Sequence, residues 1–172
     1  DHRLFFKGYN DLVDLDGSKD SSGVPNTPTG RTDGIEVTYA DYIDYVGYFD
    51  SKKCYSYSTP SDNSFASTGR FNPSGAAGNS ASSGTSYGHS CSGNWSGNFL
   101  NWATMARIDI IRRILYGGKR IQDDAGTATS LTPTTGNFGT TVLGRTILPR
   151  DAHSWAKVYK GNDVSEFVPS GF

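Results

Sequence analysis

The chain has 172 residues, a length that suits one domain, which we place at residues 1–172. Its 16 basic and 17 acidic side chains leave a formal net charge of −1. Because neither sign dominates, the composition argues against a nucleic-acid partner and against an anionic membrane surface. Glycine, with 21 residues, and aromatic side chains, at 13% of the chain, are abundant, which is typical of loop-rich proteins outside the cell. No signal peptide and no transmembrane run is visible.

Short apolar runs predict the strands of one small sheet. These runs are Leu4–Phe6, Ile35–Tyr39 and Val142–Leu148. Stretches rich in Gly, Ser and Thr at about 21–33, 58–90 and 122–140 predict long exposed insertions. The tail, residues 167–172, is predicted to be extended.

An acidic loop at residues 11–20 raises the question of a metal. Asp14, Asp16, Ser18 and Asp20 place oxygen side chains at alternating positions, which is the spacing of the first half of a calcium loop. The pattern is incomplete, because Lys19 stands where a glycine is expected and no acidic residue closes the loop. Two interpretations stay open: Ca²⁺ or another hard cation bound by Asp14, Asp16 and Asp20, or a solvated acidic turn.

Seven aromatic side chains lie between Tyr39 and Tyr57. They could form a stacking platform for a ligand. We favour the alternative that large rings anchor irregular backbone on a small core.

The two cysteines, Cys54 and Cys91, bracket one of the predicted insertions. Neither lies in a pattern that suits zinc, so a zinc site is not expected. Two lone cysteines on either side of a flexible loop indicate one disulfide, which the chain-entropy argument values at about 4 kcal/mol. Two free thiols in a cytosolic protein are the alternative.

One long helix, Asn98 to Tyr116, is the central element that the sequence predicts. Apolar residues recur at helical spacing, Ser96 or Asn98 can cap the start, and Gly117-Gly118 can end it. At about 1.5 Å per residue this helix would be about 28 Å long and would cross the domain core. We therefore predict an α+β or α/β domain with a small sheet packed on one helix.

Arg107 interrupts the apolar arc of this predicted helix. A buried arginine needs a carboxylate or backbone carbonyls. We favour a structural ion pair at Arg107, with a functional arginine as the alternative.

Catalytic chemistry is not visible in the sequence. Asp151, His153 and Ser154 share the letters of a hydrolytic triad, but their spacing within one turn does not give its geometry. No glycine-rich phosphate loop is present. We therefore expect a protein that is not an enzyme.

Several blocks of the sequence resemble a known family. They are residues 1–6 (DHRLFF), 9–11 (YND), 14–17 (DLDG), 45–50 (YVGYFD), 53–55 (KCY), 70–71 (RF), 91–102 (CSGNWSGNFLNW), 107–109 (RID), 115–118 (LYGG), 142–143, 148–149 and 151–155 (DAHSW). Together these blocks resemble the N-terminal region of the PilY/PilC-type proteins of type IV pili.

This resemblance implies a secreted, cell-surface protein that acts at the pilus tip, in adhesion and in pilus assembly or retraction. It implies a fold similar to part of a von Willebrand A-like domain, and it places Cys54 and Cys91 in a pattern consistent with a disulfide. It also places Asp14 and Asp16 in the family's acidic turn, where Ser18 and Lys19 replace the second Asp-Gly. The metal-adhesion motif D-x-S-x-S is absent from the sequence.

Two functions follow as hypotheses. The first is an extracellular adhesion or biogenesis domain associated with type IV pili, with pilus proteins and a surface receptor as partners. The second is a structural subunit of an extracellular filament that self-assembles by strand donation between chains, with the tail 167–172 as a donor. By the family pattern the chain begins within a strand, so we expect a fragment, a processed product or a short relative.

Overall fold

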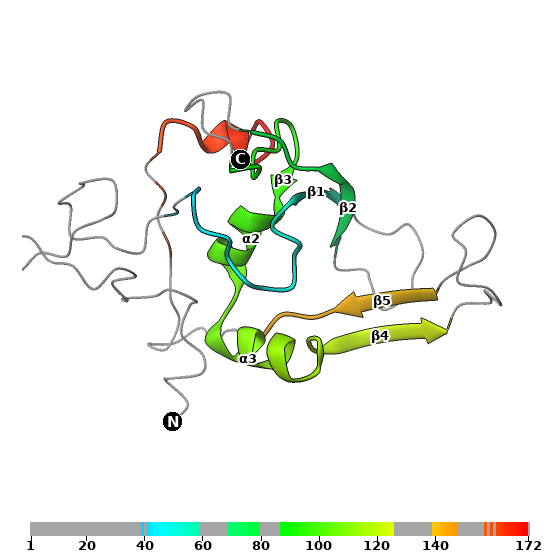
Figure 1. Cartoon of the computed structure of the whole chain (residues 1–172). Helices are drawn as coiled ribbons and strands as arrows, with labels where there is room; N and C mark the ends of the chain where they lie inside the picture. Colours follow the sequence, from blue (N-terminus) through cyan, green and yellow to red (C-terminus); the bar gives the residue numbers. More distant parts are fainter. Residues whose placement is uncertain are drawn as a thin grey trace, which may run out of the picture.

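A computed structural model of the chain describes residues 39, 41–58, 69–79, 87–125, 139–147, 157, 159 and 161–171. The described part forms a small α/β domain with one three-stranded sheet, one two-stranded ribbon, two α-helices and a short 3₁₀ turn (Figure 1). The predicted strands at Leu4–Phe6 and residues 35–38 lie outside the described residues.

The three-stranded sheet has the order β2-β1-β3 and is antiparallel. Its strands are β1 (Lys53–Ser58), β2 (Arg70–Ala76) and β3 (Trp95–Ser96). The strand β2 lies inside the stretch 58–90 that we predicted as a loop, so that prediction is wrong for these residues. Pro73 and Gly75 weaken the local strand signal. Pairing with β1 and the ring contacts of Phe71, at 5.1 Å from Tyr57, stabilise the strand instead.

The predicted single helix is two helices. The first, α2 (Gly97–Thr104), ends at Met105, and the second, α3 (Arg107–Tyr116), begins after Ala106. Met105 and Ala106 both have extended backbone and are buried. The outer ends of the prediction are right. Ser96 caps α2 by accepting a hydrogen bond from the Phe99 N–H at 3.3 Å, and Gly117 ends α3 with a φ of 85°.

The hydrophobic core lies around α2, between the irregular segment 41–50 and the C-terminal turn η1 (Val164–Glu166). Its rings and side chains are Tyr39, Tyr45, Phe99, Trp102, Phe167 and Val168. Tyr39 is central, with its ring centroid 4.8 Å from Phe167 and 5.1 Å from Phe99. Burial of Tyr39, Tyr45 and Tyr55 supports the anchoring interpretation of the aromatic stretch for these three rings.

The tail, which we predicted to be extended, is instead partly buried in the core. Phe167 has helical backbone and, with Val168, is buried in the core of its own chain. The Ser96 N–H also donates to the Phe167 carbonyl at 2.8 Å. These two residues are therefore unsuited to the role of a donated strand.

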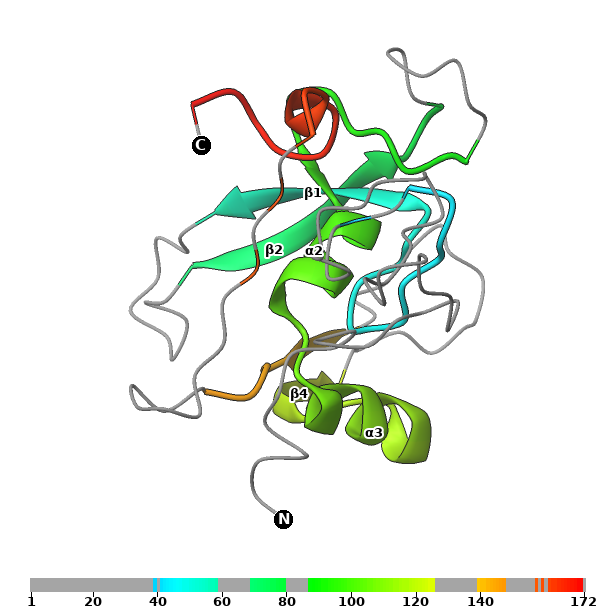
Figure 2. The ribbon, with the colours of Figure 1, turned by 90° about the vertical axis from the view of Figure 1, so that its left-hand side faces the viewer.

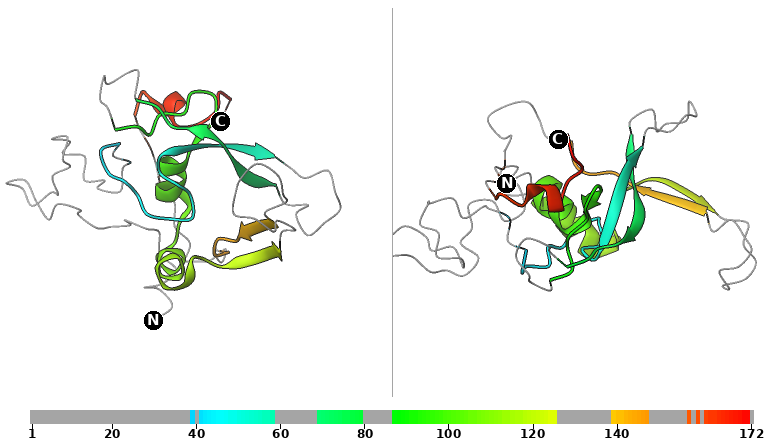
Figure 3. Two further views of the ribbon diagram at one scale, coloured as in Figure 1. Left: turned by 45° about the vertical axis from the view of Figure 1, so that its right-hand side comes forward. Right: turned by 90° about the horizontal axis from the view of Figure 1, so that it is seen from above.

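The second pair of strands forms a ribbon. In it, β4 (Arg120–Ala125) and β5 (Gly139–Leu143) are antiparallel, and they project away from the rest of the domain (Figure 3). Of the predicted strand Val142–Leu148, Val142 and Leu143 lie in β5, but residues 144–147 do not lie in a strand. The predicted insertion at 122–140 is wrong for residues 122–125 and 139–140, which lie in β4 and β5, because their pairing stabilises strands that the local composition does not indicate. In Figure 2, α2 lies between the three-stranded sheet on one side and α3 on the other.

Candidate functional site

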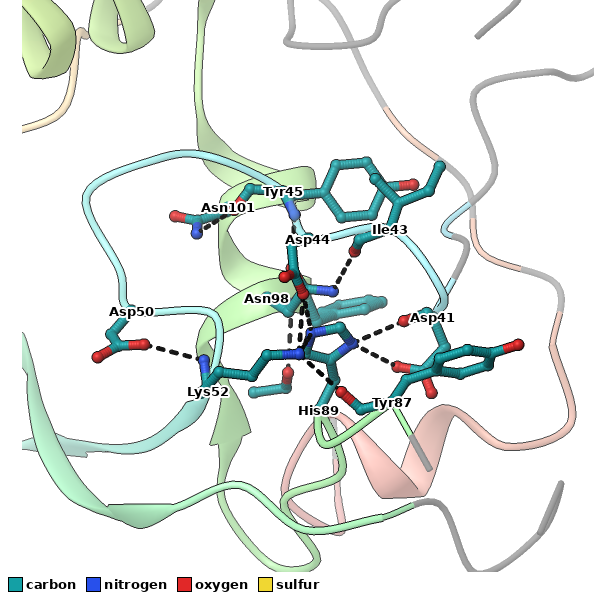
Figure 4. Close-up of polar contacts among 12 residues, drawn as sticks. Asp41, Ile43, Asp44, Tyr45, Asp50, Lys52, Tyr87, His89, Asn98 and Asn101 are labelled. Carbon is teal, nitrogen blue, oxygen red and sulfur yellow. Dashed lines mark hydrogen bonds and ion pairs between the residues drawn. The ribbon is translucent and has the colours of Figure 1, made fainter. Parts of the chain in front are cut away.

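Two buried asparagines one turn apart on α2 hold the irregular segment 41–50. Asn98 accepts from the Tyr45 N–H at 2.7 Å and donates to the Ile43 carbonyl at 2.8 Å and to the Tyr39 hydroxyl at 3.0 Å. Asn101 donates to the Tyr45 carbonyl at 2.8 Å. Because residues three apart share a helix face, both amides point at the same segment (Figure 4).

Asn101 also holds the far end of that segment. It accepts from the Phe49 N–H at 3.0 Å and donates to the Phe49 carbonyl at 2.9 Å. Gly47 allows this close approach, since a Cβ built there would lie 2.1 Å from the Asn101 Oδ1. The segment contains neither helix nor strand, so side-chain amides replace the hydrogen bonds that regular structure would supply.

A charged cluster lies against the same segment. We define the His89 cluster as Asp41, Asp44, Lys52 and His89 (Figure 4). The His89 Nδ1 lies 2.6 Å from the Asp41 carbonyl oxygen and 3.1 Å from its Oδ1, and the Nε2 lies 2.6 Å from the Asp44 Oδ1. Lys52 Nζ lies 2.9 Å from the same Asp44 oxygen. Two carboxylates thus face two cationic side chains.

The geometry favours the doubly protonated imidazole. Burial alone lowers the pKa of His89, but its hydrogen bonds to the side chain and backbone of Asp41 and to Asp44 raise it, and the net pKa lies above the usual 6.5. The hydrogen bond from Lys52, together with that from His89, holds the pKa of Asp44 below 3.8, although burial raises it. His89 and Lys52 therefore share Asp44 as an acceptor, and their 2.9 Å contact joins two like charges that this carboxylate compensates.

A second buried polar centre forms at the start of α3. The Asp109 Oδ2 accepts from the Ala106 N–H at 3.2 Å, which caps the helix. Its Oδ1 accepts from the Thr146 N–H at 2.9 Å and from the Thr146 hydroxyl at 2.8 Å. Arg112 lies 3.9 Å from the same oxygen. Asp109 thereby joins α3 to the chain that follows β5.

These buried centres are structural rather than chemical. His89 is 1% exposed, and both of its ring nitrogens are occupied by partners from its own chain. It therefore has no free nitrogen to exchange a proton with an external substrate. No group of three or more His, Cys, Asp or Glu side chains in the described ranges is arranged to hold a metal ion.

The site residues predicted from the sequence have different outcomes. Cys54 and Cys91 form a disulfide with Cα atoms 5.5 Å apart. Asp14, Asp16 and Asp20 lie outside the described residues, and so does His153.

We predicted Arg107 near the middle of one long helix. In the structure it is the first residue of α3 and is half-buried. Its ion pair stays a prediction, and the fully buried charge of α3 belongs to Asp109. A continuous helix gives Asp109 no role as a cap, so sequence reasoning does not single out this residue.

Four exposed apolar side chains of the described part lie at the end of α3 or just after it, whereas the others, among them Ile147 at 88% exposure, lie on other segments. We define the α3 surface as Ile114, Leu115, Tyr116 and Ile121, which are 72%, 73%, 56% and 46% exposed. The first three form the last turn of α3, and Ile121 follows in β4. No helix among the described residues has the length and apolar content to span a membrane.

Comparison with known proteins identifies the family. The family model described as "PilY1 homolog, small alpha/beta domain" matches residues 36–171. Two proteins of Xylella fastidiosa, both named type IV pilus biogenesis factor PilY1 homolog, are similar to the chain. One is 34% identical over 98% of this chain and 9% of the relative, and the other is 40% identical over 51% of this chain and 7% of the relative.

The chain thus spans less than a tenth of the length of either relative. No solved structure matches it significantly. The family match covers most of the chain and agrees with the helices and small antiparallel sheets of the described part. The chain therefore belongs to the PilY1 homolog family and carries its small α/β domain.

Proposed function

We propose that this domain is a non-catalytic part of a type IV pilus biogenesis factor that acts outside the cell, in pilus assembly and adhesion. The family match carries the proposal, since both relatives are named as pilus biogenesis factors. The Cys54–Cys91 disulfide supports the location, because disulfides persist in oxidising compartments. The enclosed histidine and the exposed α3 surface favour a binding role over catalysis.

A deletion in the organism that encodes the chain tests this function. The coding region for residues 36–171 is removed in frame from the chromosomal gene, and surface pili are counted by electron microscopy. We expect fewer pili and weaker cell adhesion, both restored by the wild-type gene. An unchanged pilus count together with unchanged adhesion would sink the proposal. If the pilus count is unchanged but adhesion is lost, the domain acts in adhesion and not in pilus assembly.

Strand donation is a second candidate, and the β4–β5 ribbon is the observation that favours it. A two-stranded ribbon is marginally stable by itself, and no third strand of the described part pairs with it. In this candidate a strand from another chain would pair with the ribbon. Sedimentation and electron microscopy of untreated material test it: regular fibres are expected, and a monomer of 18.5 kDa would contradict it.

Calcium binding by Asp14, Asp16 and Asp20 is a further proposal, supported by the spacing of these residues in the sequence. Titration calorimetry with Ca²⁺ on the wild type and on the Asp14→Asn, Asp16→Asn double variant measures it. Heat released by the wild type alone supports the site, and equal heats from the two proteins would contradict it.

A fold similar to part of a von Willebrand A-like domain stays a prediction that follows from the resemblance.

A further inference from the structure

The α3 surface is a cluster rather than a scatter of exposed apolar residues. Isolated exposed apolar side chains are normal on protein surfaces. Here three consecutive residues, Ile114, Leu115 and Tyr116, are each more than half exposed in one helical turn. Ile121 adds a fourth apolar side chain just after the turn that ends the helix. Such a cluster is typical of a protein interaction site.

Three exposed basic side chains stand next to this surface. Arg113, Lys119 and Arg120 are exposed. Of the acidic groups nearby, Asp109 is fully buried, and Asp123 lies 3.6 Å from Arg120. A cation in the last turn of a helix is stabilised by the helix dipole, which accounts for Arg113 without a partner protein. Lys119 and Arg120 lie beyond the helix end, where the dipole does not account for them; Arg120 pairs with Asp123, and Lys119 is exposed next to the apolar side chains.

The positions of the exposed apolar and basic side chains favour one kind of partner for the α3 surface over others. A second copy of the chain on a twofold axis would place the same cations opposite each other, which disfavours self-association. A lipid surface suits a helix that lies flat with an apolar stripe along its length. Here the most exposed apolar residues of α3 are consecutive and so spread around its last turn, while Ile108 and Ile111 are partly buried. The surface presents a helix end.

We propose that the α3 surface docks an acidic segment of another pilus-assembly protein, with apolar side chains of that segment packed on Leu115 and its neighbours. This inference rests on the proposed function, which gives the domain other pilus proteins as partners. Carboxylates of the segment would face Arg113, Lys119 and Arg120, and its apolar side chains would cover the four exposed residues. The apolar contact supplies affinity, and the charges select an acidic partner.

A short fluorescein-labelled peptide in which glutamate and leucine alternate is the probe. We expect it to bind the full chain, with an affinity that falls as salt is added. Leu115→Ser and Arg113→Glu should each weaken binding by about tenfold or more. Both residues are exposed, so the melting temperature should change little. The matched control is Val164→Ser, which removes a 39% exposed apolar residue on η1, at the opposite end of the domain (Figure 1).

Several results would overturn the inference. They are no binding of this peptide, equal binding of a lysine–leucine peptide, or equal binding by the α3 variants. Binding to phosphatidylglycerol vesicles alone would identify a lipid surface instead, and concentration-dependent dimers lost in Leu115→Ser would identify a second copy.

The same variants in the native gene separate this inference from the proposed function. We expect Leu115→Ser and Arg113→Glu to lower the pilus count and Val164→Ser to leave it unchanged. If deletion of residues 36–171 abolishes pili but the α3 variants do not lower the count, the proposed function stands and the docking surface falls. If the deletion has no effect on pili or adhesion, the proposed function falls whatever the peptide does.

Discussion

Replacing Asn101 by alanine tests whether side-chain amides hold the irregular segment 41–50. Asn101 is buried, and its amide makes three hydrogen bonds to the backbone of Tyr45 and Phe49, at 2.8, 2.9 and 3.0 Å. The variant removes all three bonds and leaves two carbonyls and one N–H without their partner. Water reaches this position poorly, so it cannot fully replace the amide.

The expected loss can be worked from these contacts. A hydrogen bond of this kind contributes about 1 kcal/mol net, and an unsatisfied buried group costs about 1–3 kcal/mol. Three bonds therefore predict a loss of at least about 3 kcal/mol in the free energy of unfolding. Because a domain has only about 5–15 kcal/mol in total, the variant should be visibly destabilised.

Urea unfolding followed by tryptophan fluorescence measures this loss. Asn72→Ala is the matched control, because Asn72 is on β2 and donates one exposed hydrogen bond to Ser58; its loss should stay within about 0.5 kcal/mol. Asn101→Asp keeps an acceptor but cannot donate to the carbonyls, and should cost at least as much as alanine. A loss below about 1 kcal/mol in Asn101→Ala, with an unchanged urea slope, would refute the role of Asn101.

Three further perturbations follow from the same structure. Because the folded pKa of His89 is raised, its stabilising contribution is complete below pH 6.5 and is lost as the pH rises through the folded value; stability curves of the wild type and His89→Gln should converge above it, and parallel curves would contradict this. Reducing the Cys54–Cys91 disulfide, which closes a separation of 37 residues, should remove about 4 kcal/mol; an unchanged melting temperature after reduction argues otherwise. Gly97→Ala places a Cβ 2.1 Å from a backbone oxygen and should cost about 1–3 kcal/mol, whereas Gly75→Ala meets open space and should be nearly neutral in the same melt.

The helix ends that depend on interactions within one turn could be predicted from the sequence. The start of α2 and the end of α3 follow from Ser96 and Gly117, whose side-chain oxygen and left-handed backbone act within one turn. The break at Met105 and Ala106 has no such local signal, because apolar residues continue at helical spacing through it. It depends on Asp109, whose carboxylate caps α3 and binds a segment 37 residues further along the chain.

The His89 cluster was missed for a similar reason, although a signal existed. Asp41 and His89 are 48 residues apart, so no spacing rule connects them. Yet Lys52 and His89 each stand two residues before a cysteine of the disulfide. Once the cysteines pair, the residues beside them come close, and a lysine and a histidine at such a place require carboxylates nearby.

The buried polar side chains that contact the segment 41–50 share one task, which bears on where function can reside. Asn98 and Asn101 bind the backbone of the segment 41–50, and the Tyr55 hydroxyl accepts from the Asp50 N–H at 2.8 Å. The His89 cluster joins the same segment to the disulfide. These groups form hydrogen bonds to the chain itself, and these bonds replace the backbone hydrogen bonds that a helix or strand would supply to the segment. A ligand therefore has to be recognised by exposed groups, and the end of α3 presents three strongly exposed apolar side chains in one turn together with basic side chains.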